Sequence, residues 1–462
     1  MLYADFSSVL IKDSAKAELR GWAGLAIGSL AVAGIFAILI AVSRIPGIEK
    51  LGIWPLDFFQ KGLIIHVIFS FVVWFMAVMG ALWHLTTLKM AKGAPRAEPL
   101  GRGGVAMGWL SMVFLFVPAL MDRSEPSLNN YLPIIIDPLY YGGLITLGAG
   151  LLLTAVRLFL NIGRYPDRLD GIAWAGIGSA AIYVVALACF LDAFVELSGH
   201  DVDEAYNEYL FWGGGHILQF ANTTLLAASW AILGAIAFGK PLVSERVLKT
   251  AALLLLLFAL IGPAFYTAYE ALSFEQRQAF TDLQYGLGPS ALLVALASLY
   301  GMTQAKGAGG LPWKEPAFLC LVLSAGVFGL GGVFGFFVDG ADTRTPSHYH
   351  AMIGGVGLAY MGLFYALFLP LLNRELNRGK ALYWQIYLYA FGQVLQCIGL
   401  YVAGSDGTAR KAAGADQGLT LIGKVGMGLN GLGGLTAVIG GAMFIWVCAA
   451  ALLRKQPEPA AR

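Results

Sequence analysis

The chain has 462 residues, of which 58% are hydrophobic and only 13% are charged. Together with a mean hydropathy of +0.71, this composition excludes a soluble globular domain and is typical of a protein that crosses a membrane many times. The formal net charge is +2, and no basic run indicates a nucleic-acid partner. The first partner that we expect is therefore the membrane lipid.

Twelve apolar stretches are long enough to cross a bilayer, and they predict an all-α membrane protein. We expect an N-terminal segment over 1–21, a twelve-helix membrane domain over 22–453 and a tail over 454–462. Lys and Arg are concentrated in the N-terminus, the even-numbered loops and the C-terminus, which predicts that both termini are cytoplasmic. The predicted spans lie near residues 22–44, 62–88, 105–121, 134–161, 170–197, 208–238, 249–271, 288–305, 315–338, 347–372, 381–404 and 428–453.

The second span holds two of the six histidines of the chain, one near each end. His66 and His84 are separated by about 27 Å along a helix, so they cannot bind one metal ion. His66 is expected inside the membrane, near the outer surface. His84 is interpreted as an interfacial histidine close to the cytoplasmic headgroups.

The sixth and seventh spans carry the next polar candidates. Gly213, Gly214 and Gly215 directly precede His216, although each glycine destabilises a helix by about 1 kcal/mol. Their presence predicts either that a bulky, flat group approaches the backbone or that helices pack tightly here. The seventh span ends at Glu270 near the outer surface.

The tenth span begins with a second histidine pair, His348 and His350. Residues two apart on an α-helix point about 200° from each other, so this helix offers an imidazole on each of two faces. In the predicted orientation this pair lies at a similar depth to His66, His216 and Glu270. Side chains of this kind inside a membrane are costly, and their common depth indicates a cofactor site.

Histidines in the second, sixth and tenth of twelve spans, the last as His-x-His, resemble the catalytic subunit of the haem–copper oxidase superfamily, which includes nitric oxide reductases. The likeness covers about residues 15–455. It implies that His66 and His350 ligate a low-spin haem, that His348 ligates a high-spin haem, and that His216 binds a non-haem metal.

The same resemblance implies a role for the basic residues between spans eleven and twelve. In the family such residues pair with haem propionates, and Arg410 and Lys411 occupy the matching place. The Trp-Gly-Gly-Gly-His context of the sixth span is most similar to C-type oxidases and nitric oxide reductases. The chain has no Cys-x-x-Cys-His, so we expect b-type haems and no covalent haem c.

The chain departs from the family at the non-haem metal. The two adjacent histidines that the family has at the end of span seven are absent, and Phe220 stands where oxidases have a tyrosine. Copper favours several imidazoles, whereas iron accepts mixed histidine and carboxylate ligands. Either His216 and Glu270, with water or Tyr266, hold an iron, or no second metal binds.

These observations predict a haem b oxidoreductase of a bacterial cytoplasmic membrane that reduces a small gas, with nitric oxide favoured over dioxygen. His348, His216 and Glu270 are the predicted catalytic residues. The electron donor is expected to be a cytochrome c, a cupredoxin or quinol, most simply a small donor subunit on the outer face. The alternative is an electron-transfer or haem-sensing membrane subunit that has lost the non-haem metal.

Overall fold

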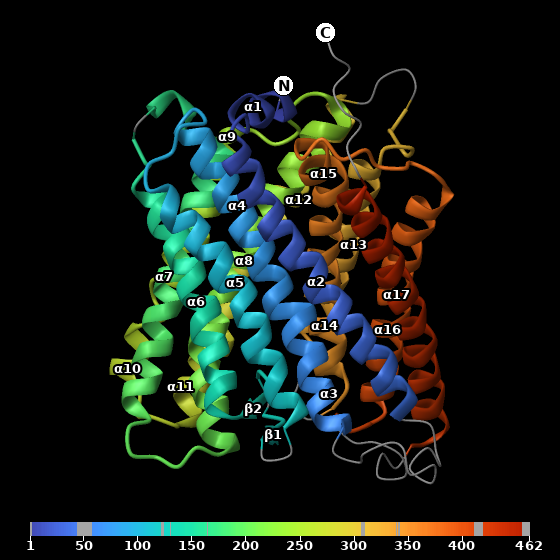
Figure 1. The fold of residues 1–462 in the computed structure, drawn as a ribbon. Helices are drawn as coiled ribbons and strands as arrows, with labels where there is room; N and C mark the ends of the chain where they lie inside the picture. Colours follow the sequence, from blue (N-terminus) through green and yellow to red (C-terminus); the bar gives the residue numbers. More distant parts are fainter. Residues whose placement is uncertain are drawn as a thin grey trace. The chain divides into compact units, whose positions relative to one another are not determined.

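The fold is a set of long apolar helices (Figure 1). A computed structural model describes residues 2–43, 58–121, 124–129, 131–163, 165–305, 310–338, 340, 342–410 and 419–454. Twelve helices within these residues are long and apolar enough to cross a membrane, which confirms the predicted number. They are Asp13–Ile40, Gln60–Met90, Glu98–Leu120, Pro138–Phe159, Gly171–Glu196, Glu204–Phe238, Glu245–Ala268, Phe274–Ala305, Pro316–Gly335, Arg344–Leu371, Lys380–Ser405 and Leu421–Leu453.

The first spanning helix begins earlier than its hydropathy indicates. It starts at Asp13, inside the segment 1–21 that we expected to precede the membrane domain. An acidic residue in the first turn favours a helix start because it interacts with the positive end of the helix dipole. The first turns also carry Glu18, which is buried, so they look polar in the sequence although they are part of the packed bundle.

The chain divides into two compact units, and each is described here by itself. Unit 1 comprises Met1–Ser29 and Gln60–Leu311, and unit 2 comprises Leu30–Phe59 and Pro312–Arg462. The elements of unit 1, counting helices that begin or end at its limits, are α1 Leu2–Val9, α2 Asp13–Ser43, α3 Phe58–Val67, η2 Ile68–Val73, α4 Trp74–Met90, α5 Glu98–Phe116, η3 Val117–Leu120, β1 Glu125–Ser127, β2 Ile134–Ile136, α6 Pro138–Phe159, η4 Pro166–Arg168, α7 Gly171–Glu196, α8 Glu204–Phe238, α9 Glu245–Ala259, α10 Ala264–Ala268, α11 Phe274–Leu283, η5 Gln284–Gly286 and α12 Leu287–Ala305.

A short antiparallel hairpin in unit 1 was not anticipated by the hydropathy pattern. Strands β1 and β2 pair with Glu125 opposite Ile136. Asp137 follows directly, and its carboxylate accepts the backbone N–H of Leu139 as the N-cap of α6. The same carboxylate accepts a hydrogen bond from Ser124 at 2.9 Å, which ties the start of the hairpin to the start of α6.

Unit 2 is built on close contacts between α-helices. Gly392 and Gly399 of α16 face the backbone of α17, where a Cβ on either glycine would collide with main-chain atoms. Small residues let membrane helices approach in this way. The start of α14 is joined to the segment after α16 by a bridge between Asp342 and Ala409. The elements of this unit, besides the second part of α2, are α13 Pro316–Gly335, α14 Arg344–Leu363, η6 Phe364–Phe368, α15 Leu369–Leu371, α16 Lys380–Ser405 and α17 Leu421–Leu453.

Candidate functional site

His66 lies where the second spanning helix changes its winding. It is the penultimate residue of α3, and the π-helical segment η2 follows over Ile68–Val73. A π-helix forms i to i+5 hydrogen bonds and widens one turn, and such segments occur frequently at functional sites. The His66 side chain is partly exposed in unit 1. Its position at this irregular turn is consistent with the predicted role as a ligand, which remains a prediction.

The histidine pair of unit 2 is held by hydroxyl contacts from the first turn of its helix. Ser347 is fully buried and donates a hydrogen bond of 2.7 Å to the carbonyl of Cys397 on α16. Thr343, one turn earlier, donates to the carbonyl of Leu400 at the same distance. Both contacts secure the beginning of α14 against α16, and they set the rotation at which this helix presents its histidines.

His348 has a defined hydrogen-bonding partner on the neighbouring helix. Its Nδ1 lies 2.8 Å from the carbonyl oxygen of Gly331 on α13. A carbonyl oxygen only accepts hydrogen bonds, so Nδ1 carries the proton and the lone pair is on Nε2. Backbone carbonyls orient metal-binding histidines in this way. His348 is therefore prepared to ligate a metal through Nε2.

His350 lies on the same helix as His348. Both belong to α14, so the helix separates the two imidazoles onto different faces. The His350 ring contacts that of Tyr349, with ring centroids 5.1 Å apart. Arg410, the predicted propionate partner, has an electrostatic interaction with Tyr349, and its role stays a prediction. Lys411 lies outside the described residues.

His216 is surrounded by aromatic rings in unit 1. It is 8% exposed, and its ring stacks on Tyr131 with centroids 4.8 Å apart and on Trp212 at 4.9 Å. Its Nδ1 donates to the Trp212 carbonyl at 2.6 Å, so its Nε2 also carries the lone pair. The ring of Phe280 on α11 is also near His216, with the two ring centroids 6.5 Å apart.

Tyr131 reaches this site from the loop of the β1–β2 hairpin. The Asn129 side-chain oxygen accepts the backbone N–H groups of Tyr131 and Leu132 at 3.0 and 2.9 Å, a local turn that asparagine favours. Burial raises the pKa of the Tyr131 phenol, which is also bonded to Gln219. The phenol therefore stays protonated beside His216.

The three glycines before His216 are explained by aromatic side chains of the same unit. A Cβ on Gly213 would collide with Phe280 and with the hydroxyl of Tyr266, one on Gly214 with Phe190, and one on Gly215 with Tyr131. The sequence predicted either a bulky, flat group near the backbone or tight helix packing, and each holds in part. Flat groups do approach the backbone, and within the described residues they are rings of the protein, so the glycines are a packing feature.

Replacing Gly215 with alanine tests this packing. The added methyl group enters the Tyr131 ring, so we expect the free energy of unfolding to fall by about 1–3 kcal/mol, as for other overpacked cores. Thermal and denaturant unfolding of the purified protein in detergent measures this loss. Gly329→Ala on α13 is the matched control, because nothing lies within 4 Å of its Cβ position. An equal loss in both variants would contradict the assignment.

Glu270 is the second ligand of the iron site that we predict at His216. It lies just after α10 and is exposed. No three His, Cys, Asp or Glu side chains come together as possible metal ligands within the part of the chain that the structure describes. The iron site of His216 and Glu270 has only two such side chains, completed by water or Tyr266, and it stays a prediction.

Two groups of functional interest escaped the sequence analysis. Tyr131 lies in a loop with no motif, and only the run of glycines indicated that a ring approaches α8. The prediction that His84 is an interfacial histidine is wrong, because its side chain is 0% exposed and is ion-paired with Glu18. From sequence alone, a charged residue near the end of a spanning helix is predicted to contact solvent, because its partners on other helices are unknown.

Comparison with known proteins agrees with this arrangement. Residues 20–427 match the family described as "Cytochrome C and Quinol oxidase polypeptide I". The chain belongs to this family, subunit I of the haem–copper oxidases. A cryo-EM structure of a heme-copper terminal oxidase dimer has the same fold, with a TM-score of 0.76 and 15% sequence identity, over 98% of this chain and 86% of that chain.

Two curated proteins that are similar to this chain are described as uncharacterized. A protein of Rickettsia prowazekii (strain Madrid E) is 25% identical over 93% of this chain and 94% of its own length. A protein of Aquifex aeolicus (strain VF5) is 28% identical over 74% of this chain and 82% of its own length. Membership of a haem-binding family fits the imidazole of His348, whose free Nε2 is the nitrogen that haem iron takes.

Proposed function

We propose that this chain is a respiratory haem b oxidoreductase subunit of a bacterial cytoplasmic membrane. His66 and His350 hold a low-spin haem that relays electrons, and His348 holds a high-spin haem that reduces a small gas. The observation that carries the proposal is the hydrogen bond from His348 Nδ1 to Gly331, at 2.8 Å, since it leaves Nε2 as an iron ligand.

The residues around the pair have supporting roles in this proposal. A haem supplies an iron that changes its oxidation state and binds a small molecule on its open side. Ser347 and Thr343 hold α14 at a fixed rotation through their carbonyl contacts on α16. Arg410, close to Tyr349, supplies a positive charge for a propionate. A small electron donor on the outer face completes the subunit's function.

Nitric oxide is favoured over dioxygen as the substrate. The chain lacks the paired histidines that a copper ion prefers, and Phe220 occupies the position of the oxidase tyrosine. Phe220 is fully buried in α8. A phenylalanine has no hydroxyl group, so it cannot replace the oxidase tyrosine chemically. These features favour a reaction that does not use the oxidase copper and tyrosine.

A second candidate function is an electron-transfer or haem-sensing subunit without gas reduction. It is favoured by the packing of His216, whose ring lies beside those of Tyr131 and Trp212, with ring centroids 4.8 and 4.9 Å away. An imidazole enclosed by aromatic rings serves packing as readily as catalysis. This candidate keeps the same haem ligands and differs only in the chemistry at His348.

Gas consumption separates the two candidates. No three His, Cys, Asp or Glu side chains come together within the described residues, so for both candidates we expect an iron-to-haem ratio of about one and no copper in the purified protein. We also expect the reduced protein to consume nitric oxide, and His348→Ala to stop this consumption. His200→Ala is the control, because His200 is an exposed loop residue. Reversible oxidation of the haem without any nitric oxide or dioxygen consumption would favour the second candidate.

A further inference from the structure

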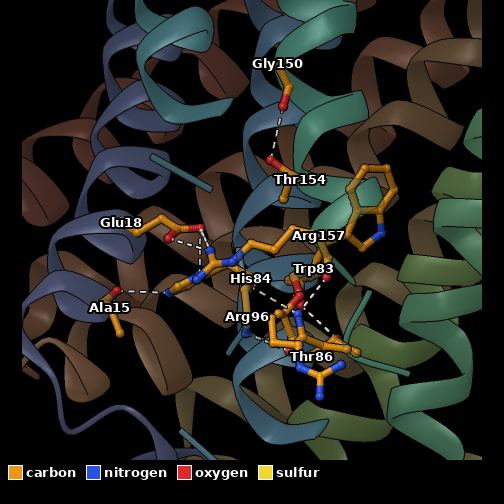
Figure 2. A network of polar contacts seen from close by, with 12 residues as sticks. Ala15, Glu18, Trp83, His84, Thr86, Arg96, Gly150, Thr154 and Arg157 are labelled. Atoms are coloured by element: carbon orange, nitrogen blue, oxygen red, sulfur yellow. Dashed lines mark hydrogen bonds and ion pairs between the residues drawn. The ribbon is translucent and has the colours of Figure 1, made fainter. Parts of the chain in front are cut away.

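Three helices of unit 1 bring a buried charged cluster together, at the opposite end of the spanning helix Gln60–Met90 from His66. Glu18 of α2, His84 of α4 and Arg157 of α6 point toward one another (Figure 2). Their exposed fractions are 5%, 0% and 2%. Charged side chains are rarely buried without a partner, and those inside membrane proteins usually serve a function. The haem chemistry proposed above uses none of these three residues.

Arg157 binds the carboxylate of Glu18 directly. One terminal nitrogen, Nη1, lies 2.6 Å from both Oε1 and Oε2 of Glu18. Such a short charge-assisted contact stabilises the ionised carboxylate. Gly101 of α5 covers the pair, and a Cβ there would collide with both side chains. The α5 backbone therefore lies directly against the ion pair and excludes water from that side.

His84 also contacts the carboxylate of Glu18. Its Nε2 lies 2.9 Å from the carbonyl oxygen of Ala15, so Nε2 carries a proton. Its Nδ1 lies 2.8 Å from Glu18 Oε1, but the two are not aligned as a hydrogen bond. A bare Nδ1 lone pair and a carboxylate oxygen would repel each other at this distance. One further proton must therefore lie at the contact.

The position of that proton follows from Arg157. The guanidinium 2.6 Å from both carboxylate oxygens stabilises the ionised form of Glu18, so a proton at this contact would lie on Nδ1 of His84. The buried cluster then holds one negative and two positive groups. Removing the proton leaves a balanced Glu18–Arg157 pair and a neutral histidine, so the two charge states of the cluster differ by one proton.

A crevice connects this cluster to the surface. It is lined by Glu18 and Arg157 together with Lys12, Glu98 and Arg102, and its cavity of about 10 Å³ is roughly the volume that one water molecule needs. Nε of Arg157 is buried without a hydrogen-bond partner, which gives such a water a donor. Lys12 and Glu98 pair at 3.3 Å at the exposed mouth.

The other charges near α4 are already neutralised among themselves. Lys89, five residues after His84, pairs with Asp5 at 3.1 Å and with Asp170. Within the described residues, Glu18 from α2 contacts His84 and Arg157 from α6 contacts Glu18. Glu98 and Arg102 from α5 and Lys12 line the crevice beside Glu18 and Arg157.

We propose that Glu18, His84 and Arg157 form a buried proton-binding site that exchanges one proton with the aqueous phase through this crevice. The ligand is a proton taken up at Nδ1 of His84, with Glu18 as its counter-ion and Arg157 as the residue that keeps Glu18 ionised. The crevice opens at the end of α4 that the charge distribution predicts to be cytoplasmic. The site does not depend on the haems or on the proposed gas reduction.

Nitrogen NMR of the full-length protein tests the site. The chain has six histidines, so selective ¹⁵N-histidine labelling gives few imidazole signals, and His84→Asn assigns the one of interest. At neutral pH we expect both nitrogens of His84 to be protonated in the wild type. In Glu18→Gln we expect Nδ1 to lose its proton, because the counter-ion is gone. Thr154→Val is the control, since Thr154 is buried on α6 and bonds to Gly150.

A pH jump then separates exchange from a static structural role. On a step from neutral to alkaline pH, followed with an indicator dye, wild-type protein releases more protons per chain than Glu18→Gln does. Glu18→Asp, which keeps the charge, restores part of this release and guards against a folding defect in the first variant. A neutral His84 in the wild type, a doubly protonated His84 in Glu18→Gln, or equal proton release from both would overturn the proposal.

Discussion

Substituting His66 or His350 with alanine removes the low-spin haem spectrum, whereas His348→Ala keeps it and removes the high-spin signal. A low-spin haem needs two strong axial ligands, so loss of either imidazole changes its spin state or releases the haem. In the proposed assignment His348 ligates a different haem, and its position on another face of α14 from His350 allows this. Visible absorption, electron paramagnetic resonance and haem content per chain measure the outcome.

The controls for this experiment come from the remaining histidines. His200→Ala changes an exposed loop residue and should leave both haem signals intact. The backbone carbonyl of Gly331 accepts the hydrogen bond from Nδ1–H of His348, so no side-chain substitution at Gly331 removes this acceptor. Loss of the low-spin signal in His348→Ala, with retention in His350→Ala, would reverse the two assignments on α14.

Arg157→Met destabilises unit 1 strongly. The substitution removes the guanidinium that lies 2.6 Å from both carboxylate oxygens of Glu18, and breaking one partner of a buried ion pair costs about 3–5 kcal/mol. The pair is enclosed, with exposed fractions of 2% for Arg157 and 5% for Glu18, so solvent screens it little. Denaturant titration in detergent gives the free energy of unfolding, and thermal unfolding gives the midpoint.

The double variant Glu18→Gln, Arg157→Met provides the decisive comparison. It removes both charges, so we expect it to recover most of the stability that Arg157→Met loses. Arg246→Met is the surface control, because Arg246 is exposed near the start of α9. If the double variant is no more stable than Arg157→Met, the loss comes from packing of the arginine stem and not from the broken Glu18–Arg157 ion pair.

The amino-acid sequence by itself determined the membrane fold and the candidate haem ligands. A spanning helix must satisfy its own backbone hydrogen bonds and bury about twenty apolar residues, so twelve spans can be counted without any knowledge of their contacts. Histidines are scarce and costly in such spans, so His66, His216, His348 and His350 stand out individually. Their roles came from the family resemblance, and family membership supports the haem chemistry in general.

The tertiary structure decided what surrounds those residues. Tyr131 meets His216 only because a hairpin between two spans folds back onto α8, and nothing periodic in the chain encodes that contact. Glu18, His84 and Arg157 come from helices far apart in the chain and become one site only when three helix ends pack together. Hydropathy shows that a helix is apolar, whether it contacts lipid or protein. Whether two charged side chains pair depends on the distance between them, and that distance is set by helix packing.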